Sequence, residues 1–203
     1  MKNISIGVIN YGMGNHASVI HSLREMGFRV IVTNKTLELD CVDVLLLPGV
    51  GAFPAAMKAL IELNLVEYLK KQVQRGRPLI GICLGMQLLT SASYEHEYTI
   101  GLDLIPGETV PFPSGGGHIG WNTLEMVQNN SVLFPDTKEA FYFNHSFYYH
   151  GFSEYEIAMT EHTFSFASII KRAKVIGLQF HPEKSQLAGK FLLKNLIQNL
   201  NYA

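Results

Sequence analysis

The sequence contains a cysteine between two glycines, Gly81-Ile82-Cys83-Leu84-Gly85, and this is its clearest chemical signal. An apolar run precedes Cys83 and a helix-like segment follows it, the context in which hydrolases place a nucleophile on a sharp strand-to-helix turn. The glycines allow the turn without Cβ clashes, and the sulfur would lie at a helix N-terminus, where free N–H groups favour a thiolate. A lone cysteine is usually a small buried apolar residue, but this context favours a nucleophile.

A thiolate nucleophile needs a base, and His181 is the best candidate among the eight histidines. It follows the strand-like residues 175–180, so it could reach a nucleophile at the end of another strand. Glu183 could accept a hydrogen bond from the far imidazole nitrogen and orient the ring, as the carboxylate of a triad does. Taken singly, His181 could be an ordinary loop histidine and Glu183 an acidic residue at a helix N-terminus. Together with Cys83 they predict a Cys-His-Glu triad.

The segment Pro48-Gly49-Val50-Gly51 follows another apolar run. Glycine-rich backbone at a strand end can turn N–H groups toward a developing oxyanion, and the N–H of Leu84 would be a second donor. The simpler alternative is an ordinary strand-to-helix turn. A phosphate-binding loop is disfavoured, because the sequence has no G-x-x-x-x-G-K-[ST] motif. We therefore expect an oxyanion hole formed by Gly49, Val50, Gly51 and Leu84.

Strand-like and helix-like segments alternate in the first half of the chain. The strand-like segments are residues 4–10, 28–33, 42–47 and 79–82, and the helix-like segments are residues 16–26, 54–75 and 84–91. Gly27 stands where a helix C-terminal glycine belongs, and the second helix could be interrupted near Asn64. This alternation predicts a parallel sheet covered by helices.

The second half of the chain has short strand-like segments close together, at residues 141–143, 155–160, 165–171 and 175–180. We expect them to be antiparallel or mixed additions to the sheet. A final helix is predicted over residues 184–199, with Phe191, Leu192, Leu196 and Ile197 near one face. The loop at residues 111–117 is too short to separate domains, so residues 1–203 should form one domain.

The bulk properties exclude several classes of protein. The net charge is -1 and no basic excess is present, which disfavours a nucleic-acid partner. The two cysteines, Cys41 and Cys83, do not form the framework of a secreted chain, and no signal-peptide pattern is present. No apolar run approaches the roughly 20 residues of a membrane span. We expect a cytoplasmic protein without a membrane segment, in which Cys41 has a structural role.

Three motifs together resemble those of the class I (triad) glutamine amidotransferases. They are Gly81-Ile82-Cys83-Leu84-Gly85-Met86-Gln87, Gln179-Phe180-His181-Pro182-Glu183 and Pro48-Gly49-Val50-Gly51. The resemblance implies a three-layer, flavodoxin-like α/β fold, with a mostly parallel central sheet and antiparallel additions in the C-terminal half. It also implies that Cys83, His181 and Glu183 are the triad that hydrolyses glutamine, with no metal or organic cofactor.

Further motifs are similar to one branch of that family, the glutaminase subunits of imidazole glycerol phosphate synthase. They are Asn10-Tyr11-Gly12-Met13-Gly14-Asn15, His118-Ile119-Gly120-Trp121-Asn122 and His181-Pro182-Glu183-Lys184-Ser185. The resemblance covers essentially the whole chain. It implies a heterodimer with a (β/α)8-barrel cyclase subunit, which receives the ammonia for histidine biosynthesis.

The same resemblance implies roles for individual residues. Gln87 and the backbone of His145, Ser146 and Phe147 would hold the amino-acid end of glutamine. The strand Gly49, Val50 and Gly51 would rearrange to complete the oxyanion hole when the partner binds its ligand. Trp121, Tyr142 and Lys184 would face the barrel subunit, where ammonia crosses.

One departure from the family pattern leaves the destination of the ammonia open. Gly115-Gly116-Gly117 stands where the family usually has a lysine and a proline. Paralogous glutaminases supply ammonia to sugar-amination enzymes of surface glycan biosynthesis, and this remains the alternative. Cysteine peptidases or chaperone-like relatives of similar fold generally have histidine directly after the nucleophile, where this chain has Leu84. A binding module without catalysis would not need all three triad residues.

Overall fold

The computed structural model describes residues 4–14, 16–113, 115–128 and 139–202, so Asn15 and Ser114 lie outside the described residues. The first half of the chain alternates strands with helices, as predicted. Its elements are β1 (Ser5–Ile9), α1 (His16–Glu25), β2 (Arg29–Thr33), α2 (Thr36–Leu39), β3 (Val44–Gly49), α3 (Phe53–Glu62), α4 (Leu65–Gln74), β4 (Leu79–Cys83) and α5 (Leu84–Leu88).

The second half contributes mainly strands. These are β5 (Ala92–Ser93), β6 (Thr99–Ile100), β7 (Gly107–Pro111), β8 (His118–Thr123), β9 (Glu125–Met126), β10 (Ala140–His145), β11 (Phe147–Gly151), β12 (Glu156–Glu161), β13 (Ser165–Arg172) and β14 (Val175–Leu178). The 3-10 turns η1 (Ser153–Tyr155) and η2 (Pro182–Lys184) and the helix α6 (Gln186–Tyr202) complete the described residues.

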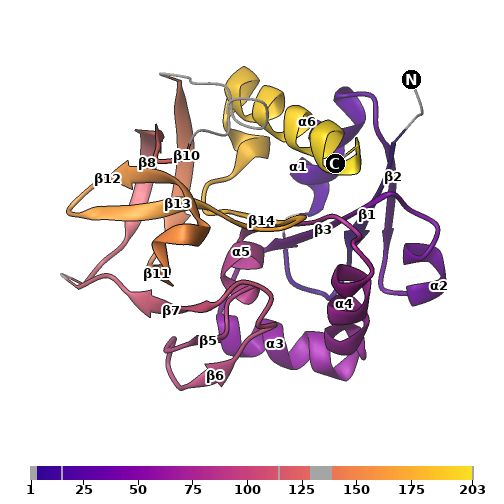
Figure 1. Ribbon diagram of the computed structural model, residues 1–203, viewed down its shortest axis with the longest axis horizontal. Helices are drawn as coiled ribbons and strands as arrows, with labels where there is room; N and C mark the ends of the chain where they lie inside the picture. Colours follow the sequence, from indigo (N-terminus) through magenta and orange to yellow (C-terminus); the bar gives the residue numbers. More distant parts are fainter. Residues whose placement is uncertain (1–3, 15, 114, 129–138, 203) are drawn as a thin grey trace.

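Most of these strands join one sheet in the order β2-β1-β3-β4-β14-β13-β11-β7-β5-β6, with β12 and β9 attached through β13. Strands β2, β1, β3, β4 and β14 are parallel, and β13, β12 and β11 continue the sheet in antiparallel pairs. The predicted parallel sheet with antiparallel additions is therefore confirmed. Strand β10 instead pairs with β8 in a separate two-stranded sheet beside the main one (Figure 1).

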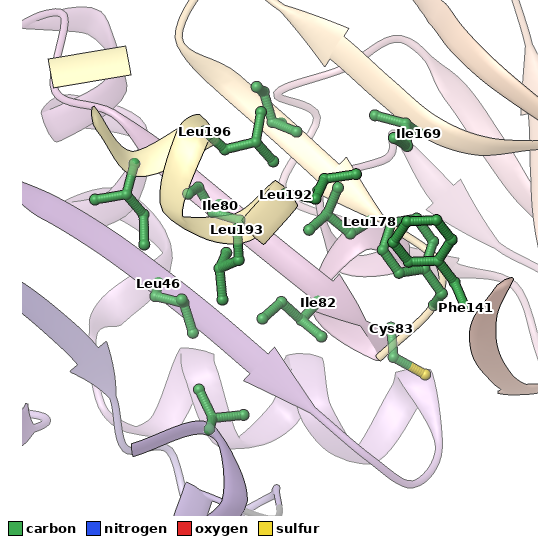
Figure 2. Close-up of a cluster of buried hydrophobic side chains, with 14 of the residues drawn as sticks. Leu46, Ile80, Ile82, Cys83, Phe141, Ile169, Leu178, Leu192, Leu193 and Leu196 are labelled. Atoms are coloured by element: carbon green, nitrogen blue, oxygen red, sulfur yellow. The ribbon is translucent and has the colours of Figure 1, made fainter. Parts of the chain in front are cut away.

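Helices cover both faces of the parallel strands (Figure 1). Helices α1 and α6 pack on one face, and α3, α4 and α5 pack on the other. Strand β3 illustrates the cause, because successive strand side chains point to opposite faces: Leu46 joins the first core, and Leu45 and Leu47 join the second. Figure 2 shows the first core, in which Leu193 and Leu196 of α6 pack over the sheet and Cys83 lies at the end of β4.

Several local predictions are confirmed. Gly27 adopts a φ of +88° after α1, where the N–H of Phe28 bonds to the carbonyl of Leu23, closing a Schellman-type helix end. Asn64 adopts the left-handed conformation and separates α3 from α4. Within the described residues, no helix is long and apolar enough to cross a membrane.

Other local predictions are wrong. The last helix begins at Gln186 rather than at residue 184, because Pro182–Lys184 form a 3-10 turn first. Phe191 is 59% exposed and does not belong to the buried face of that helix, whereas Leu192, Leu196 and Ile197 are buried. Cys41 is exposed, and its structural role stays a prediction.

Candidate active site

Cys83 occupies a strained bend between β4 and α5. Its backbone has φ 54° and ψ -111°, a conformation that residues with a side chain rarely adopt. The flanking glycines are required by space: a Cβ on Gly85 would overlap the carbonyl of Leu47, and one on Gly81 would press on the carbonyl of Gly85. The bend therefore holds the thiol at the carboxyl end of the parallel strands, where open α/β sheets bind ligands.

His181 and Glu183 follow β14, which is the parallel neighbour of β4. The Nδ1 atom of His181 lies 2.9 Å from Oε1 of Glu183, and Cys83 and His181 line the same cavity, close enough for Cys83 to raise the pKa of His181. The structure thus brings together the three side chains that the sequence singled out. All three are buried, which keeps competing water away from their interactions.

The charge state of His181 follows from its neighbours. Burial by itself would lower the pKa of His181, but hydrogen bonds and Coulombic attraction to Cys83 and Glu183 outweigh burial and raise the pKa to about 9. The imidazolium form is therefore favoured beside the sulfur at neutral pH. The backbone of His181 is fixed as well, because its N–H donates to the carbonyl of Tyr142 and its carbonyl accepts from Ser185 Oγ.

A cavity of about 270 Å³ opens at Cys83, which suits a small polar substrate. Its lining residues come from the segment after β3, from the end of β4 and α5, from the segment between β5 and β6, from the adjoining ends of β10 and β11, and from the segment after β14. They are Val50, Gly51, Cys83, Leu84, Gln87, Glu95, Asn144, His145, Ser146, Phe147 and His181. Gly49 lies just behind this wall and pairs with Cys83 in the sheet.

Gln87 and His145 both hold the same backbone group. Gln87 Nε2 donates to the carbonyl of Phe147 at 3.0 Å, and His145 Nδ1 donates to it at 2.7 Å. Burial, partly offset by this hydrogen bond, lowers the pKa of His145 to about 3, so its ring is neutral at neutral pH. These two side chains therefore shape the wall formed by Ser146 and Phe147.

Glu95 is a residue of the cavity that the sequence did not reveal. Its carboxylate is buried, and Oε2 accepts a hydrogen bond from the N–H of Phe53 at 2.7 Å, at the start of α3. It lies between the two-residue strands β5 and β6, which are too short to give a periodic signal. An acidic residue in a segment without a motif offered no cue to its position.

Trp121, Tyr142 and Lys184 form a group that extends outward from His181. The Tyr142 ring lies 6.4 Å from the His181 ring and 5.8 Å from the Trp121 ring, measured between centroids. Lys184 Nζ lies 5.7 Å from the centroid of the Tyr142 ring. Trp121 is half exposed, so this group connects the catalytic side chains with the surface.

Side chains that could ligate a metal do not cluster in the described part of the chain. Within those residues, no three or more His, Cys, Asp or Glu side chains gather so as to hold a metal ion. The chemistry available at the cavity is that of a cysteine nucleophile with a charged histidine beside it.

Comparison with known proteins points in the same direction. The family model for class I glutamine amidotransferases matches residues 7–199. A protein of Carboxydothermus hydrogenoformans named imidazole glycerol phosphate synthase subunit HisH is 43% identical over 196 residues, covering 95% of this chain and 98% of that protein. The Aquifex aeolicus protein of the same name is 44% identical, covering 93% of each chain.

Solved structures support the fold. A crystal structure described as a glutamine amidotransferase superposes with a TM-score of 0.78 at 18% identity, covering 98% of this chain and 99% of that one. Another glutamine amidotransferase, from Thermotoga maritima, superposes with a TM-score of 0.70 at 16% identity, covering all of both chains.

Proposed function

Because this chain belongs to the class I glutamine amidotransferase family, we propose that it is the glutaminase subunit of an imidazole glycerol phosphate synthase. The observation that carries the proposal is the Cys83–His181–Glu183 arrangement at a small cavity, in a chain about 40% identical to subunits of that name. The family match spans residues 7–199, which supports one domain over residues 1–203.

The reaction is an acyl transfer through Cys83. Its thiolate attacks the side-chain amide carbon of glutamine, and the tetrahedral intermediate collapses as the C–N bond breaks. His181 gives its proton to the departing nitrogen, which leaves as ammonia, and a γ-glutamyl thioester remains on the sulfur. His181 then takes a proton from water, whose oxygen attacks the thioester and releases glutamate. Glu183 keeps the imidazole oriented throughout.

The oxyanion is stabilised by backbone donors. The N–H of Leu84, at the first residue of α5, is one donor, and the strand Gly49, Val50 and Gly51 supplies the other. Gly49 lies beside Cys83 in the sheet, which supports this assignment. Rearrangement of this strand, when the partner binds its own ligand, would couple the two reactions.

The amino-acid end of glutamine needs one anionic and one hydrogen-bonding site. The buried carboxylate of Glu95 suits the α-ammonium group, and the backbone of His145, Ser146 and Phe147 suits the α-carboxylate. Gln87 maintains this wall through the carbonyl of Phe147. The geometry thus leaves the amide end of glutamine for Cys83.

The partner is a (β/α)8-barrel cyclase subunit that docks over Trp121, Tyr142 and Lys184. Ammonia released at His181 passes this group and enters the barrel, where it is used to form imidazole glycerol phosphate. The contiguity of the three side chains with His181 supports this route. Among the residues that the structure describes, we find none that favours the alternative acceptor, a sugar-amination enzyme, over the barrel subunit.

The proposal is tested by supplying glutamine to the chain mixed with each candidate acceptor. With a barrel cyclase subunit and its phosphoribulosyl nucleotide substrate, we expect one imidazole glycerol phosphate for each glutamate formed. Glutamine-dependent amination of a sugar nucleotide, without formation of imidazole glycerol phosphate, would instead assign the chain to the glycan pathway.

A further inference from the structure

The turn after β1 contains a buried tyrosine to which the reaction above assigns no role. Tyr11 is 2% exposed, and its hydroxyl donates to the carbonyl oxygen of Pro48 at 2.8 Å. Pro48 directly precedes the segment Gly49–Gly51, called here the oxyanion strand, which starts at the last residue of β3 and forms part of the proposed oxyanion hole. A buried hydrogen bond at this point fixes one end of that strand.

The alternation of β3 explains why this carbonyl is available. The N–H of Leu45 donates to the carbonyl of Pro78, which directly precedes β4. The backbone N–H and C=O groups of alternate residues of β3 therefore face β4, and those of the residues between them face β1. Pro48 therefore faces β1, but the β1–β3 pairing ends at Val8 and Leu46. The Tyr11 hydroxyl satisfies the Pro48 carbonyl where the sheet no longer does.

Tyr11 also lies against the next residue. A Cβ added to Gly49 would come within 2.5 Å of the Tyr11 oxygen, so the phenol occupies space that a side chain at Gly49 would fill. Burial, together with the Coulombic effect of Cys83, raises the pKa of Tyr11, which places a neutral hydroxyl in the surroundings of the nucleophile.

The other end of the strand contacts the same turn. Gly51 has a φ of +107°, and a Cβ added there would come within 2.8 Å of Met13 Cε. Methionine is flexible and adapts to small movements of its neighbours. The turn therefore meets the strand through a rigid hydrogen bond at Pro48 and a deformable contact at Gly51.

We propose that Tyr11 is a positioning residue for the oxyanion strand: its hydroxyl anchors the Pro48 carbonyl, so that rearrangement is confined to the peptides on either side of Val50. Met13 supports the end that moves. The inference rests on the proposed function. It adds that Tyr11 holds the oxyanion strand in place, so that the N–H donor of this strand has a defined position. Because the oxyanion develops in the transition state and the tetrahedral intermediate and is absent from bound glutamine, loss of the anchor should lower kcat and leave KM for glutamine nearly unchanged.

Tyr11→Phe removes only the hydroxyl and tests this directly. Tyr149→Phe is a matched control, because Tyr149 is also 2% exposed and its hydroxyl donates to the carbonyl of Pro106, outside the cavity. In the complex with the barrel subunit, we expect Tyr11→Phe to lower kcat roughly 10-fold or more while KM changes less than about twofold. The control should retain wild-type kinetics with a similar loss of thermal stability.

Rates are normalised to the assembled complex isolated by size-exclusion chromatography, so that misfolded protein does not count. A normalised kcat for Tyr11→Phe equal to that of Tyr149→Phe would overturn the inference. So would a shifted pH profile of Cys83 alkylation, since this would mean that Tyr11 acts on the nucleophile rather than on the strand. If the wild-type complex itself hydrolyses no glutamine, the proposed function fails instead.

Discussion

His181 carries the charge on which the chemistry of the site depends. It lies between a thiol and a carboxylate, and all three groups are shielded from water. In the proposed reaction His181 transfers a proton in each half: it gives one to the departing ammonia and then takes a different one from water. A buried imidazolium also links the stability of the fold to pH.

Stability should decline as pH rises through the pKa of His181. Its pKa is raised from 6.5 to about 9 in the folded chain, so its contribution is fully present below about pH 6.5 and is lost as pH rises through about 9. Urea unfolding of wild type and of His181→Asn should converge across this range, since asparagine keeps a donor for Glu183 but does not titrate. His21→Asn, at an exposed position, controls for the substitution. If the free energies of unfolding of wild type and His181→Asn differed by the same amount at every pH, the raised pKa of His181 would be contradicted.

Glu95 should contribute to substrate binding more than to turnover. Glu95→Gln keeps an acceptor for the Phe53 N–H but removes the negative charge from the cavity. We expect KM for glutamine to rise about 10- to 100-fold with a smaller change in kcat, as for loss of a charge-assisted hydrogen bond. The exposed Glu97→Gln is the matched control. An unchanged KM in Glu95→Gln would place the ammonium group elsewhere.

Residues with a motif around them were predictable, and residues without one were not. Cys83 was visible because two glycines mark a bend, and His181 because it closes a strand. Glu95 and Tyr11 act through contacts with distant segments, to Phe53 and Pro48, which no local pattern encodes.

At the level of elements, the unit β4–bend–α5 determines where the nucleophile lies. Helix α5 packs so closely on β3 that the α-carbon of Gly85 approaches the carbonyl of Leu47. This contact leaves no room for a side chain. The strained backbone of Cys83 persists because the elements on both sides are fixed.

Gly85→Ala should therefore be strongly destabilising. Its Cβ would overlap backbone rather than a flexible side chain, and we expect a loss of about 3 kcal/mol in the free energy of unfolding. Gly116→Ala is the comparison, because a Cβ there meets open space and the φ of +75° alone costs about 1 kcal/mol. Chemical denaturation of both variants measures the difference. Equal losses would mean that the bend is not tightly packed.

Element boundaries were less predictable than element types. The βα alternation was evident from apolar runs, but β3 continues through Pro48 to Gly49, where the sequence suggested that it ends. The proline is tolerated because its position faces the β1 side, where the β1–β3 pairing has ended. Strands β5, β6 and β9 have two residues each, too few to give a periodic signal, and β7 and β8 were not predicted either.

At the scale of the whole molecule, the antiparallel half carries the proposed docking surface beside the parallel core. The sheet β2-β1-β3-β4-β14 builds the nucleophile site, and the separate pair β8-β10 presents Trp121 and Tyr142 beside it. The sequence predicted these interface residues only through family resemblance, since the β8–β10 pairing is not encoded locally. In Figure 1 this pair lies at the opposite side of the molecule from α2.

Trp121 should be a main contributor to partner affinity. It is a half-exposed aromatic residue, the kind that dominates interface energies, and we expect Trp121→Ala to raise the Kd for the barrel subunit roughly 30-fold. Leu37→Ala removes an 80% exposed apolar side chain from α2, away from this surface, and is the control. Calorimetric titration gives both values. An effect of Leu37→Ala equal to that of Trp121→Ala would exclude the proposed docking surface.

The most direct test of the whole account is glutamate formation by wild type and by Cys83→Ala, each in complex with the barrel subunit. We expect Cys83→Ala to lose at least about 10⁴-fold in glutamine hydrolysis, the scale at which triad nucleophiles act. The same complex should still form the cyclase product when ammonium salt replaces glutamine, which shows that both subunits remain folded and assembled. Continued release of glutamate by Cys83→Ala at the wild-type rate would contradict the central claim that Cys83 is the nucleophile.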